Sequence, residues 1–598
     1  MQEISLKTKK KIFYIEIIIF VSIGFLFLRL FYLQFFKSAE LYKRALANQT
    51  QVLKIQANRS IIYDRTKEYQ LAYNKPSIAV YLIPAYLPQK KNEQMIVFSN
   101  IMKLLDVSYE YIQTAITQQA IDKYTPVILE YDTDYKTLVR LSEFSENLQG
   151  LYWDNIPKRT YPLREKAAQL IGYTGVISKE ELKKLKSNPE YHPGSILGKM
   201  GIESYYDEII RGKEGIKERI VDARGNVKEE EMKKEPVPGD TLVLSIDGKL
   251  QELAYDLMAN KVGAVVVSKP ATGEILALVS SPSFDPNIFT DKFSFSTEEF
   301  FLIKSHVDKP FLNRAIQGTY PPSSTFKIVT SSALLHSDID PAKTFYCSGG
   351  MRIGNRFFKC WNVHGPVNLI TGLAHSCDVY YYSVGLMLGR DPIIKYAEEW
   401  GVNKKSGIDL PGEVAGLIPE MEWFKKKYDR PWQNGDTANI AIGQGDLLIT
   451  PVALNVMTMA IANNGLILKP FILKEILSYE NESKKWQKNP EVLRRIDVSP
   501  EKMEIIKKGL YGVTTFGTAR WIKDVIKIPV AGKTGTGEAG KGKETHALFT
   551  CFAPYGATNV NDIIAVTVVV EHGGGGSGVA APIAVKLIDF YFKNRTNN

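Results

Sequence analysis

The chain has 598 residues, of which 44% are hydrophobic and 23% are charged, as in ordinary globular proteins. This composition excludes a disordered, a collagen-like and a polytopic membrane protein, and the length leaves room for more than one domain. The net charge is +10, but the lysines do not form one basic stretch interleaved with aromatic residues, so we expect no nucleic-acid partner. Four cysteines are too few for a disulfide scaffold.

The first forty residues predict a membrane anchor. Residues 1–11 carry four lysines and one acid, and an apolar run from Ile12 to Phe36 follows, with Glu16 and Arg29 as its ionisable residues. As a helix this run is about 37 Å long, enough to cross a hydrocarbon core of roughly 30 Å. No cleavage site follows it, so we expect a single-pass anchor that stays attached. The lysines before it predict a cytoplasmic tail at 1–11, a transmembrane helix at 12–36 and an exported remainder.

The exported part divides at a turn-rich segment, Glu235–Asp240, which we take as the boundary between domains at 37–240 and 241–598. In the second domain we expect a helix, a hairpin and two central strands, in that order. These elements are predicted at residues 247–258, at 263–268 with 274–279, and at 548–552 with 563–570. The fold class is therefore α+β, with helices on a mainly antiparallel sheet.

Three segments far apart in the sequence carry residues that suit acyl transfer. A helix that starts after Pro321 and Pro322 would place Ser324 and Lys327 on one face. The serine needs a base, and a lysine can serve only if burial or a neighbouring cation lowers its pKa. Lys533, in a strand-like segment at 531–537, supplies a second cation. Between the two lies Ser376-Cys377-Asp378, with a hydroxyl and a carboxylate two residues apart.

The serine–lysine spacing alone is weak, because it is common on solvated helix faces. Ser323 competes with Ser324 for the role of nucleophile, but its place after two prolines predicts an N-cap instead. All three segments in this order are far more specific than any one of them.

The ordered set resembles the signature of the penicillin-recognising serine acyltransferases, which is Ser-x-x-Lys, Ser-x-Asn and Lys-Thr-Gly. Asp378 stands in place of the asparagine, and this variant is similar to that of the elongation-type class B penicillin-binding proteins. Ser60 and Glu68 depart from glycines that the family usually has. Further segments that agree with this family are Arg59–Arg65, Gly198–Glu203 with Tyr206-Asp207, Gly443–Asp446 with Thr450-Pro451, and Glu571–Pro582.

The resemblance implies a pedestal of the dimerisation type at 37–240 and a transpeptidase domain with a serine β-lactamase-like fold at 241–598. Ser324 would attack the carbonyl between the two terminal D-alanines of a peptidoglycan stem peptide, and Lys327 would take its proton. The amine of a neighbouring stem peptide would then capture the acyl group, and β-lactams would acylate the same serine.

The resemblance also assigns the remaining site residues. Ser376 would pass the proton to the leaving amine, with Lys533 tuning the network and Asp378 completing the catalytic set. Backbone N–H groups of Ser324 and Thr536 would form an oxyanion hole. Thr534, Gly535 and Thr536 would bind the substrate, the two hydroxyls holding its carboxylate.

By the same resemblance, the enzyme would work in side-wall elongation at the bacterial inner membrane, with its catalytic domain in the periplasm. Its expected partners are a RodA-like glycan polymerase and an MreC-like scaffold. The alternatives are a septal class B enzyme, a β-lactam hydrolase or sensor, and a scaffold without catalysis that activates a polymerase. The Ser-Cys-Asp segment and the glycine-rich end argue against the first, and the long pedestal argues against the second.

A second cluster predicts a structural zinc site. Cys347, Cys360, His364 and Cys377 offer thiolate and imidazole ligands within a short stretch, and His364 follows Cys360 by four residues. A disulfide or simple buried thiols are the alternatives, and His375 is a rival ligand. Some elongation-type members resemble this chain in having a zinc site there, with mixed Asp, His and Cys ligands. Cys551 is expected in the core of a strand.

Overall fold

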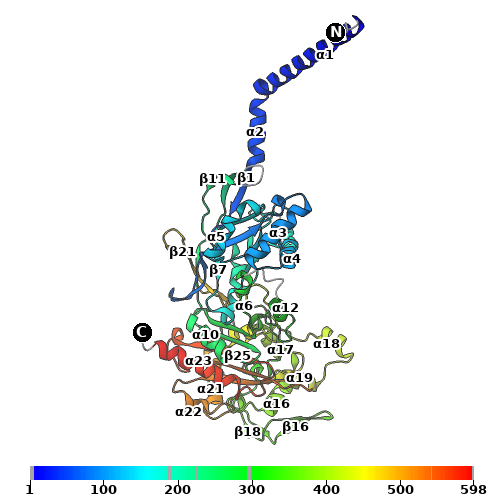
Figure 1. Ribbon diagram of the computed structural model, residues 1–598. Coiled ribbons are helices and arrows are strands. Elements are labelled where there is room, and N and C mark those ends of the chain that lie inside the picture. Colours follow the sequence, from blue (N-terminus) through cyan, green and yellow to red (C-terminus); the bar gives the residue numbers. More distant parts are fainter. Residues whose placement is uncertain are drawn as a thin grey trace.

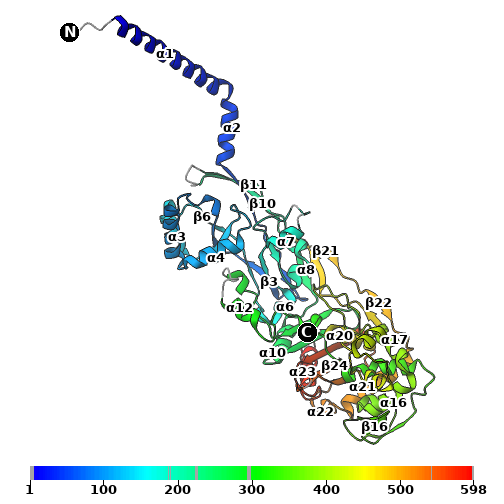
Figure 2. The ribbon, with the colours of Figure 1, turned by 90° about the vertical axis from the view of Figure 1, so that its right-hand side faces the viewer.

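A computed structural model describes residues 6–185, 187–188, 190–221, 227–291, 298–540 and 542–595. The first five residues of the expected cytoplasmic tail, and residues 596–598, lie outside the described ranges. The molecule is elongated: a helical arm stands at one end, a middle region follows, and a larger C-terminal region forms the other end (Figures 1 and 2).

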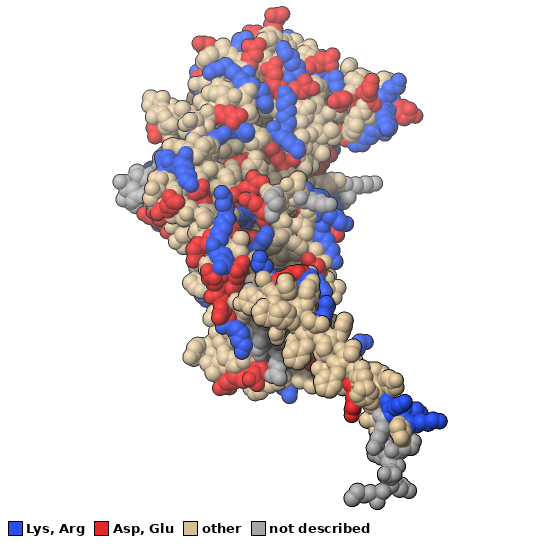
Figure 3. Space-filling model, turned by 90° about the horizontal axis from the view of Figure 1, so that it is seen from above, with Lys and Arg blue, Asp and Glu red and all other residues tan. Residues whose placement is uncertain are grey.

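The arm consists of helix α1 (Leu6–Phe31), a π-helical turn (Tyr32–Phe36) and helix α2 (Ser38–Gln49). Among the described residues, Lys10–Phe35 is the one segment long and apolar enough to cross a membrane. None of its side chains is buried. Figure 3 shows this arm with few charges along it and basic side chains near its free end. The position agrees with the span predicted at 12–36.

The middle region includes two small three-stranded sheets and the helices α3, α4 and α5. The strand order is β1-β10-β11 in the first sheet and β5-β4-β6 in the second, and both are antiparallel. Helices α3 and α4 pack on the second sheet through Phe98, Ile101 and Ile112, which are buried against Val80 and Leu82. The bounds are β1 (Thr50–Ile55), β4 (Ile78–Leu82), α3 (Lys91–Leu105), α4 (Tyr109–Gln119), β5 (Val127–Glu130), α5 (Tyr135–Glu143), β6 (Leu151–Asn155), β10 (Gly215–Val221) and β11 (Val227–Lys234).

Four buried charges hold the base of the middle region together. Arg59 pairs with Glu203 at 2.8 Å and with Asp207 at 2.8 Å, and Arg159 pairs with Glu203 at 2.7 Å. None of the four is more than 5% exposed. We call this set the pedestal ion cluster. Two of the segments that carried the family resemblance therefore meet in space, because one supplies Arg59 and the other supplies Glu203.

A six-stranded sheet joins the middle region to the C-terminal region. Its order is β21-β20-β12-β2-β3-β7, and the central strands β12 and β2 run parallel. The domain boundary predicted at 240 stays a prediction, and it falls just before β12, inside this shared sheet. The Tyr206 hydroxyl also donates to Asp409 across the junction, at 2.7 Å. The bounds are β2 (Ile62–Tyr63), β3 (Gln70–Lys75), β7 (Lys158–Thr160), β12 (Thr241–Leu244), β20 (Leu473–Leu477) and β21 (Lys484–Gln487).

The C-terminal region is built on a five-stranded antiparallel sheet, in the order β14-β13-β25-β24-β23. The predicted hairpin and central strands are confirmed. Alternate residues of β25 face opposite sides, because Val566 and Val568 pack with the helix pair α10 and α23 while Ala565 and Val569 pack with α20. The bounds are α10 (Gly248–Leu257), β13 (Gly263–Ser268), β14 (Ile275–Ser281), α20 (Pro451–Ala462), β23 (Ala531–Gly537), β24 (His546–Ala553), β25 (Ile564–Val570) and α23 (Ala580–Arg595).

A helical layer beside this sheet carries the candidate site, on the side of α20. Its main helices are α14 (Lys327–Leu335), α15 (Leu369–Ala374), α16 (Asp378–Leu388), α17 (Arg390–Trp400), α19 (Asn434–Ala441) and α21 (Pro500–Thr515). The remaining elements are α6 (Ala168–Ile171), β8 (Thr174–Val176), α7 (Lys179–Lys184), β9 (Ile196–Gly198), α8 (Gly201–Tyr205), α9 (Asp207–Ile210), α11 (Ile288–Asp291), α12 (Glu298–Ser305), α13 (Arg314–Gln317), β15 (Phe345–Cys347), β16 (Gly350–Ile353), β17 (Arg356–Lys359), β18 (Gly365–Val367), α18 (Met421–Tyr428), β19 (Leu466–Leu468), β22 (Val492–Arg495) and α22 (Ile522–Val525).

Candidate active site and metal centre

The first catalytic segment begins with a tighter turn than predicted. Residues Ser323–Phe326 form a 3₁₀ turn, η6, and the α-helix starts only at Lys327. Side chains three residues apart eclipse one another in a 3₁₀ turn, so Ser324 and Lys327 still share a face. Ser324 is half-buried, and the Lys327 side chain is fully buried. Ser323 is not the predicted N-cap, because its hydroxyl donates to the Pro321 carbonyl.

The Lys327 amine joins the first segment to the second. Its Nζ lies 2.8 Å from the Ser376 carbonyl oxygen, 3.1 Å from Ser376 Oγ and 2.7 Å from Asp378 Oδ1. These acceptors match the three hydrogens that an ammonium group donates. Ser376 lies between α15 and α16 with a backbone φ of +53°, a strained value for a residue with a side chain. The structure therefore brings Lys327, Ser376 and Asp378 together.

Lys533 lies on β23 and is fully buried. Burial lowers the pKa of its amine well below the ordinary value, and the positive charge of Lys327 lowers it further, while Asp378 partly opposes the change. Its Nζ donates to the Thr534 carbonyl at 3.2 Å. Lys327 pairs with Asp378, and the charges of both act on the buried amine of Lys533. We call Lys327, Lys533 and Asp378 the catalytic charge cluster.

Strand β23 forms the edge of its sheet and lies against the turn that carries Ser324. A Cβ atom placed on Gly535 would be 3.3 Å from Thr325 Cγ2 and 3.1 Å from Leu548 Cβ, so the backbone there is packed closely on both sides. Thr534 is 7% exposed, whereas Thr536 is open to solvent. The Gln444 amide donates to the Thr536 carbonyl at 3.5 Å. The third segment therefore stands beside the first, with Thr536 on the open side.

Sequence reasoning missed two groups around this site. Thr518 Oγ1 lies 2.8 Å from Thr534 Oγ1, and the Thr518 carbonyl accepts from Ser577 at 2.9 Å. Arg314 donates to Glu571 at 2.8 Å, and the same carboxylate oxygen accepts from the Tyr320 hydroxyl at 2.8 Å. Single threonines and arginines carry no spacing signal, because their partners lie far away in the sequence.

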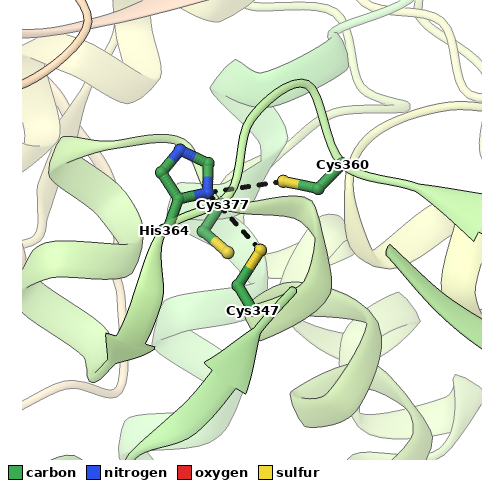
Figure 4. A group of neighbouring side chains, drawn as sticks. All are labelled: Cys347, Cys360, His364 and Cys377. Carbon is green, nitrogen blue, oxygen red and sulfur yellow. Dashed lines mark hydrogen bonds between the residues drawn. The ribbon is translucent and has the colours of Figure 1, made fainter. Parts of the chain in front are cut away.

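The four predicted metal ligands gather in one place. One donor atom from each of Cys347, Cys360, His364 and Cys377 lies within 4.8 Å of the other three (Figure 4). His364 Nδ1 lies 3.6 Å from Cys347 Sγ and 3.5 Å from Cys360 Sγ. All four cysteines are free thiols in this structure. His375 stacks on the His364 ring instead of joining the group.

The cysteine group is in direct contact with the second catalytic segment. The Asp378 backbone N–H donates to Cys360 Sγ at 3.3 Å, at the start of α16. Cys377 separates Ser376 from Asp378 in the chain and is fully buried. Cys551 lies apart from this group, in the core of β24. Cys377 therefore lies in the same loop as Ser376 and Asp378, and that loop also contacts Cys360.

Comparison with known proteins agrees with this geometry. Residues 263–589 match the model of the penicillin-binding protein transpeptidase domain, and residues 54–244 match that of the penicillin-binding protein dimerisation domain. The peptidoglycan D,D-transpeptidase MrdA of Haemophilus influenzae is 31% identical over 96% of this chain and 90% of its own length. The MrdA protein of Escherichia coli K12 is 30% identical over 93% of this chain and 90% of its own length.

Solved structures give the same result. The chain is similar to penicillin-binding protein PBP2 in its complex with MreC from Helicobacter pylori, with a TM-score of 0.77, 29% identity, and coverage of 91% of this chain and 100% of that one. It is also similar to Pseudomonas aeruginosa PBP2 in complex with WCK 5153, with a TM-score of 0.67, 28% identity, and coverage of 90% and 96%. The chain therefore belongs to the penicillin-binding proteins with a dimerisation and a transpeptidase domain, in the group of the PBP2 enzymes.

Proposed function

We propose that the chain is a peptidoglycan D,D-transpeptidase that crosslinks stem peptides during side-wall elongation, and that β-lactams inhibit it. The observation that carries the proposal is the contact of the Lys327 amine with Ser376 and Asp378, beside the strand that carries Lys533. Three segments that are separate in the sequence thereby form one site of the kind that acyl transfer needs.

In the proposed reaction, Ser324 attacks the carbonyl between the two terminal D-alanines, and its proton passes to Lys327. Burial and the neighbouring charge of Lys327 lower the pKa of the Lys533 amine, which favours a neutral amine in this cluster, and a general base needs a neutral amine. Ser376, within hydrogen-bonding distance of Lys327, then returns the proton to the leaving D-alanine. The amine of a second stem peptide attacks the acyl-enzyme, which releases Ser324.

Binding of the substrate falls to β23 in this proposal. An edge strand offers unpaired backbone groups along which an extended peptide can lie. The hydroxyls of Thr534 and Thr536, with the backbone of Gly535 between them, hold the terminal carboxylate. The backbone N–H groups of Ser324 and Thr536 receive the oxyanion.

The arm and the middle region give the proposed location. Helix α1 would anchor the chain once in the bacterial inner membrane, with the basic N-terminus in the cytoplasm and the rest in the periplasm. A complex of PBP2 with MreC is known for the Helicobacter pylori relative, which supports an MreC-like scaffold as a partner of this chain. A RodA-like glycan polymerase is the second partner that we propose.

Intact mass measured before and after benzylpenicillin tests the catalytic proposal. We expect one covalent adduct on the full chain, none on Ser324→Ala, and an unchanged adduct on the control Ser323→Ala, whose hydroxyl lies in the same turn. An adduct that persists in Ser324→Ala would refute the assignment. No adduct on the wild-type chain would favour the scaffold without catalysis, and rapid loss of the adduct would favour the hydrolase.

The cysteine group supports a further part of the proposal, a structural zinc ion. Three thiolates and one imidazole are a donor set that tetrahedral zinc prefers, and the four donor atoms already lie close together. His364 directs Nδ1 toward the sulfurs, while its Nε2 is buried without a hydrogen-bond partner among the described residues. Bound there, zinc would supply a crosslink between the loops. Cys360 and Cys377 would hold the segment of Ser376 and Asp378 in place.

Metal content of the purified chain, together with its native mass, tests this part. We expect one zinc per chain, lost in Cys360→Ser and kept in Cys551→Ser, whose sulfur lies in the sheet. A native mass lower by two hydrogens would show a disulfide instead. A metal-free chain with four reactive thiols would refute the zinc site and leave the acyl-transfer proposal untouched.

A further inference from the structure

We propose that Thr518 is a positioning residue that orients the Thr534 hydroxyl toward the carboxylate of the substrate. The inference rests on the proposed function, and it concerns a residue outside the three catalytic segments. The two hydroxyl oxygens are 2.8 Å apart, and either can be the donor.

The direction of this hydrogen bond decides what the site can bind. A hydroxyl group has one hydrogen to donate and two lone pairs to accept with, whereas a carboxylate only accepts. If Thr534 donated to Thr518, it would present a lone pair to the carboxylate and repel it. If Thr518 donates, the hydrogen of Thr534 is free for the substrate. Binding of an anion therefore requires Thr518 to be the donor.

The backbone of Thr518 is held from both sides, which leaves only its side chain free to rotate. Its N–H donates to the Ala374 carbonyl at 3.1 Å, and its carbonyl accepts from the Ser577 hydroxyl at 2.9 Å. The Trp521 indole N–H donates to Ser577 Oγ at 3.1 Å, which turns the hydrogen of Ser577 toward Thr518. The hydrogen bonds of this loop thus run in one direction, from Trp521 to Ser577 and from Ser577 to the Thr518 carbonyl.

Ser577 is itself fixed against β23 by its neighbour in the chain. A Cβ atom placed on Gly576 would lie 2.6 Å from the Gly535 carbonyl oxygen and 3.1 Å from the Gly535 nitrogen. No side chain fits there, so the glycine-rich segment lies directly on the strand of Thr534. The segments around residues 518, 534 and 577 are therefore in direct contact with one another at the proposed carboxylate site.

The test compares acylation of the full chain by benzylpenicillin and by its methyl ester, which lacks the negative charge. In Thr518→Val we expect acylation by the free acid to fall about 3- to 10-fold, the size of one hydrogen bond, with little change for the ester. Thr518→Ser keeps the hydroxyl and should restore the wild-type preference. The control is Thr515→Val, because the Thr515 hydroxyl donates only to carbonyls of its own helix.

Equal losses for acid and ester in Thr518→Val would show a merely structural role and overturn the proposal, and so would no loss for either. If Thr518→Val does not fold, Ser577→Ala decides, since it frees the Thr518 backbone and should reduce the acid preference in the same direction. A wild-type chain that is acylated by neither benzylpenicillin nor its methyl ester would refute the proposed function. A wild-type chain that is acylated equally fast by both would leave the proposed function in place and overturn only the role of Thr518.

Discussion

Two buried charge clusters in this chain are built alike and behave differently. The pedestal ion cluster has two arginines and two carboxylates, so its charges balance. The catalytic charge cluster has two lysines and one carboxylate, and the pKa of Lys533 falls well below its ordinary value because of burial and of Lys327. Arginine stays protonated in proteins, whereas lysine can lose its proton when buried. A balanced cluster of arginines fixes structure, and an unbalanced cluster of lysines prepares a base.

Removing one lysine would turn the catalytic cluster into a balanced one. In Lys327→Met the remaining amine faces one carboxylate, so we expect the pKa of Lys533 to rise and acylation by benzylpenicillin to fall by about 10²- to 10⁴-fold, the range of a lost general base. The fold should persist, with a melting temperature close to that of the wild type. Lys527→Met, at an exposed lysine of the same domain, is the control and should acylate normally. Retained activity in Lys327→Met would remove the lysine from the mechanism.

A change of charge in the pedestal ion cluster tests whether that cluster is structural. Glu203→Gln would leave two guanidinium groups with one carboxylate, and we expect a loss of about 3–5 kcal/mol in the free energy of unfolding, as for other broken buried pairs. Glu208→Gln, on the adjoining helix and exposed, should cost little. Denaturant unfolding of the full chain in detergent measures both. A Glu203→Gln variant as stable as wild type would mean that this cluster is not structural.

The pH dependence of acylation sharpens the comparison further. Because Asp378 raises the pKa of Lys533, Asp378→Asn should lower that pKa further. The neutral amine would then persist at lower pH, so the acid limb of the pH profile should move to lower pH by about one unit, a modest shift for the loss of a neighbouring charge. Asp391→Asn, at an exposed aspartate, should leave the profile in place. A shift toward higher pH would reverse the assigned sign.

The smallest expected effect lies where the two regions meet. Tyr206→Phe removes the hydrogen bond to Asp409, whose oxygens also accept from the backbone of Ile472 and Leu473. We expect a loss of about 1 kcal/mol in stability, the usual net value of one hydrogen bond. Tyr205→Phe, half exposed on the neighbouring position, is the control and should be neutral. Equal effects of the two variants would show that the junction bond contributes nothing specific.

The sequence predicted best what depends on residue order and local pattern. The hairpin, the strand of Lys533 and the helix capped by Asp247 follow from apolar runs and turn residues, and the structure confirms them. The gathering of Cys347, Cys360, His364 and Cys377 could be predicted because these residues are close in the sequence and all carry possible metal-binding donor atoms.

The features that could not be predicted depend on contacts between residues that are far apart in the sequence, and local sequence patterns do not indicate such contacts. Thr518 meets Thr534 only through folding, and Arg314 meets Glu571 in the same way. In the 3₁₀ turn before Lys327, Ser323 has a φ of +50° and its backbone N–H donates to the distant Gly443 carbonyl at 2.8 Å. The pairing of β12 with β2 likewise joins strands that are far apart along the chain.

The sheet that contains β12 limits how the molecule can move. Strands from the middle region and from the C-terminal region are hydrogen-bonded to each other within this sheet, so the two regions are not joined by a flexible linker at that point. The two regions are linked there through the pairing of Leu242 with Ile62 and of Val243 with Tyr63, so a displacement of one region is passed to the other through backbone hydrogen bonds. Relative motion of the two regions at this sheet must therefore take the form of twisting or sliding of its paired strands.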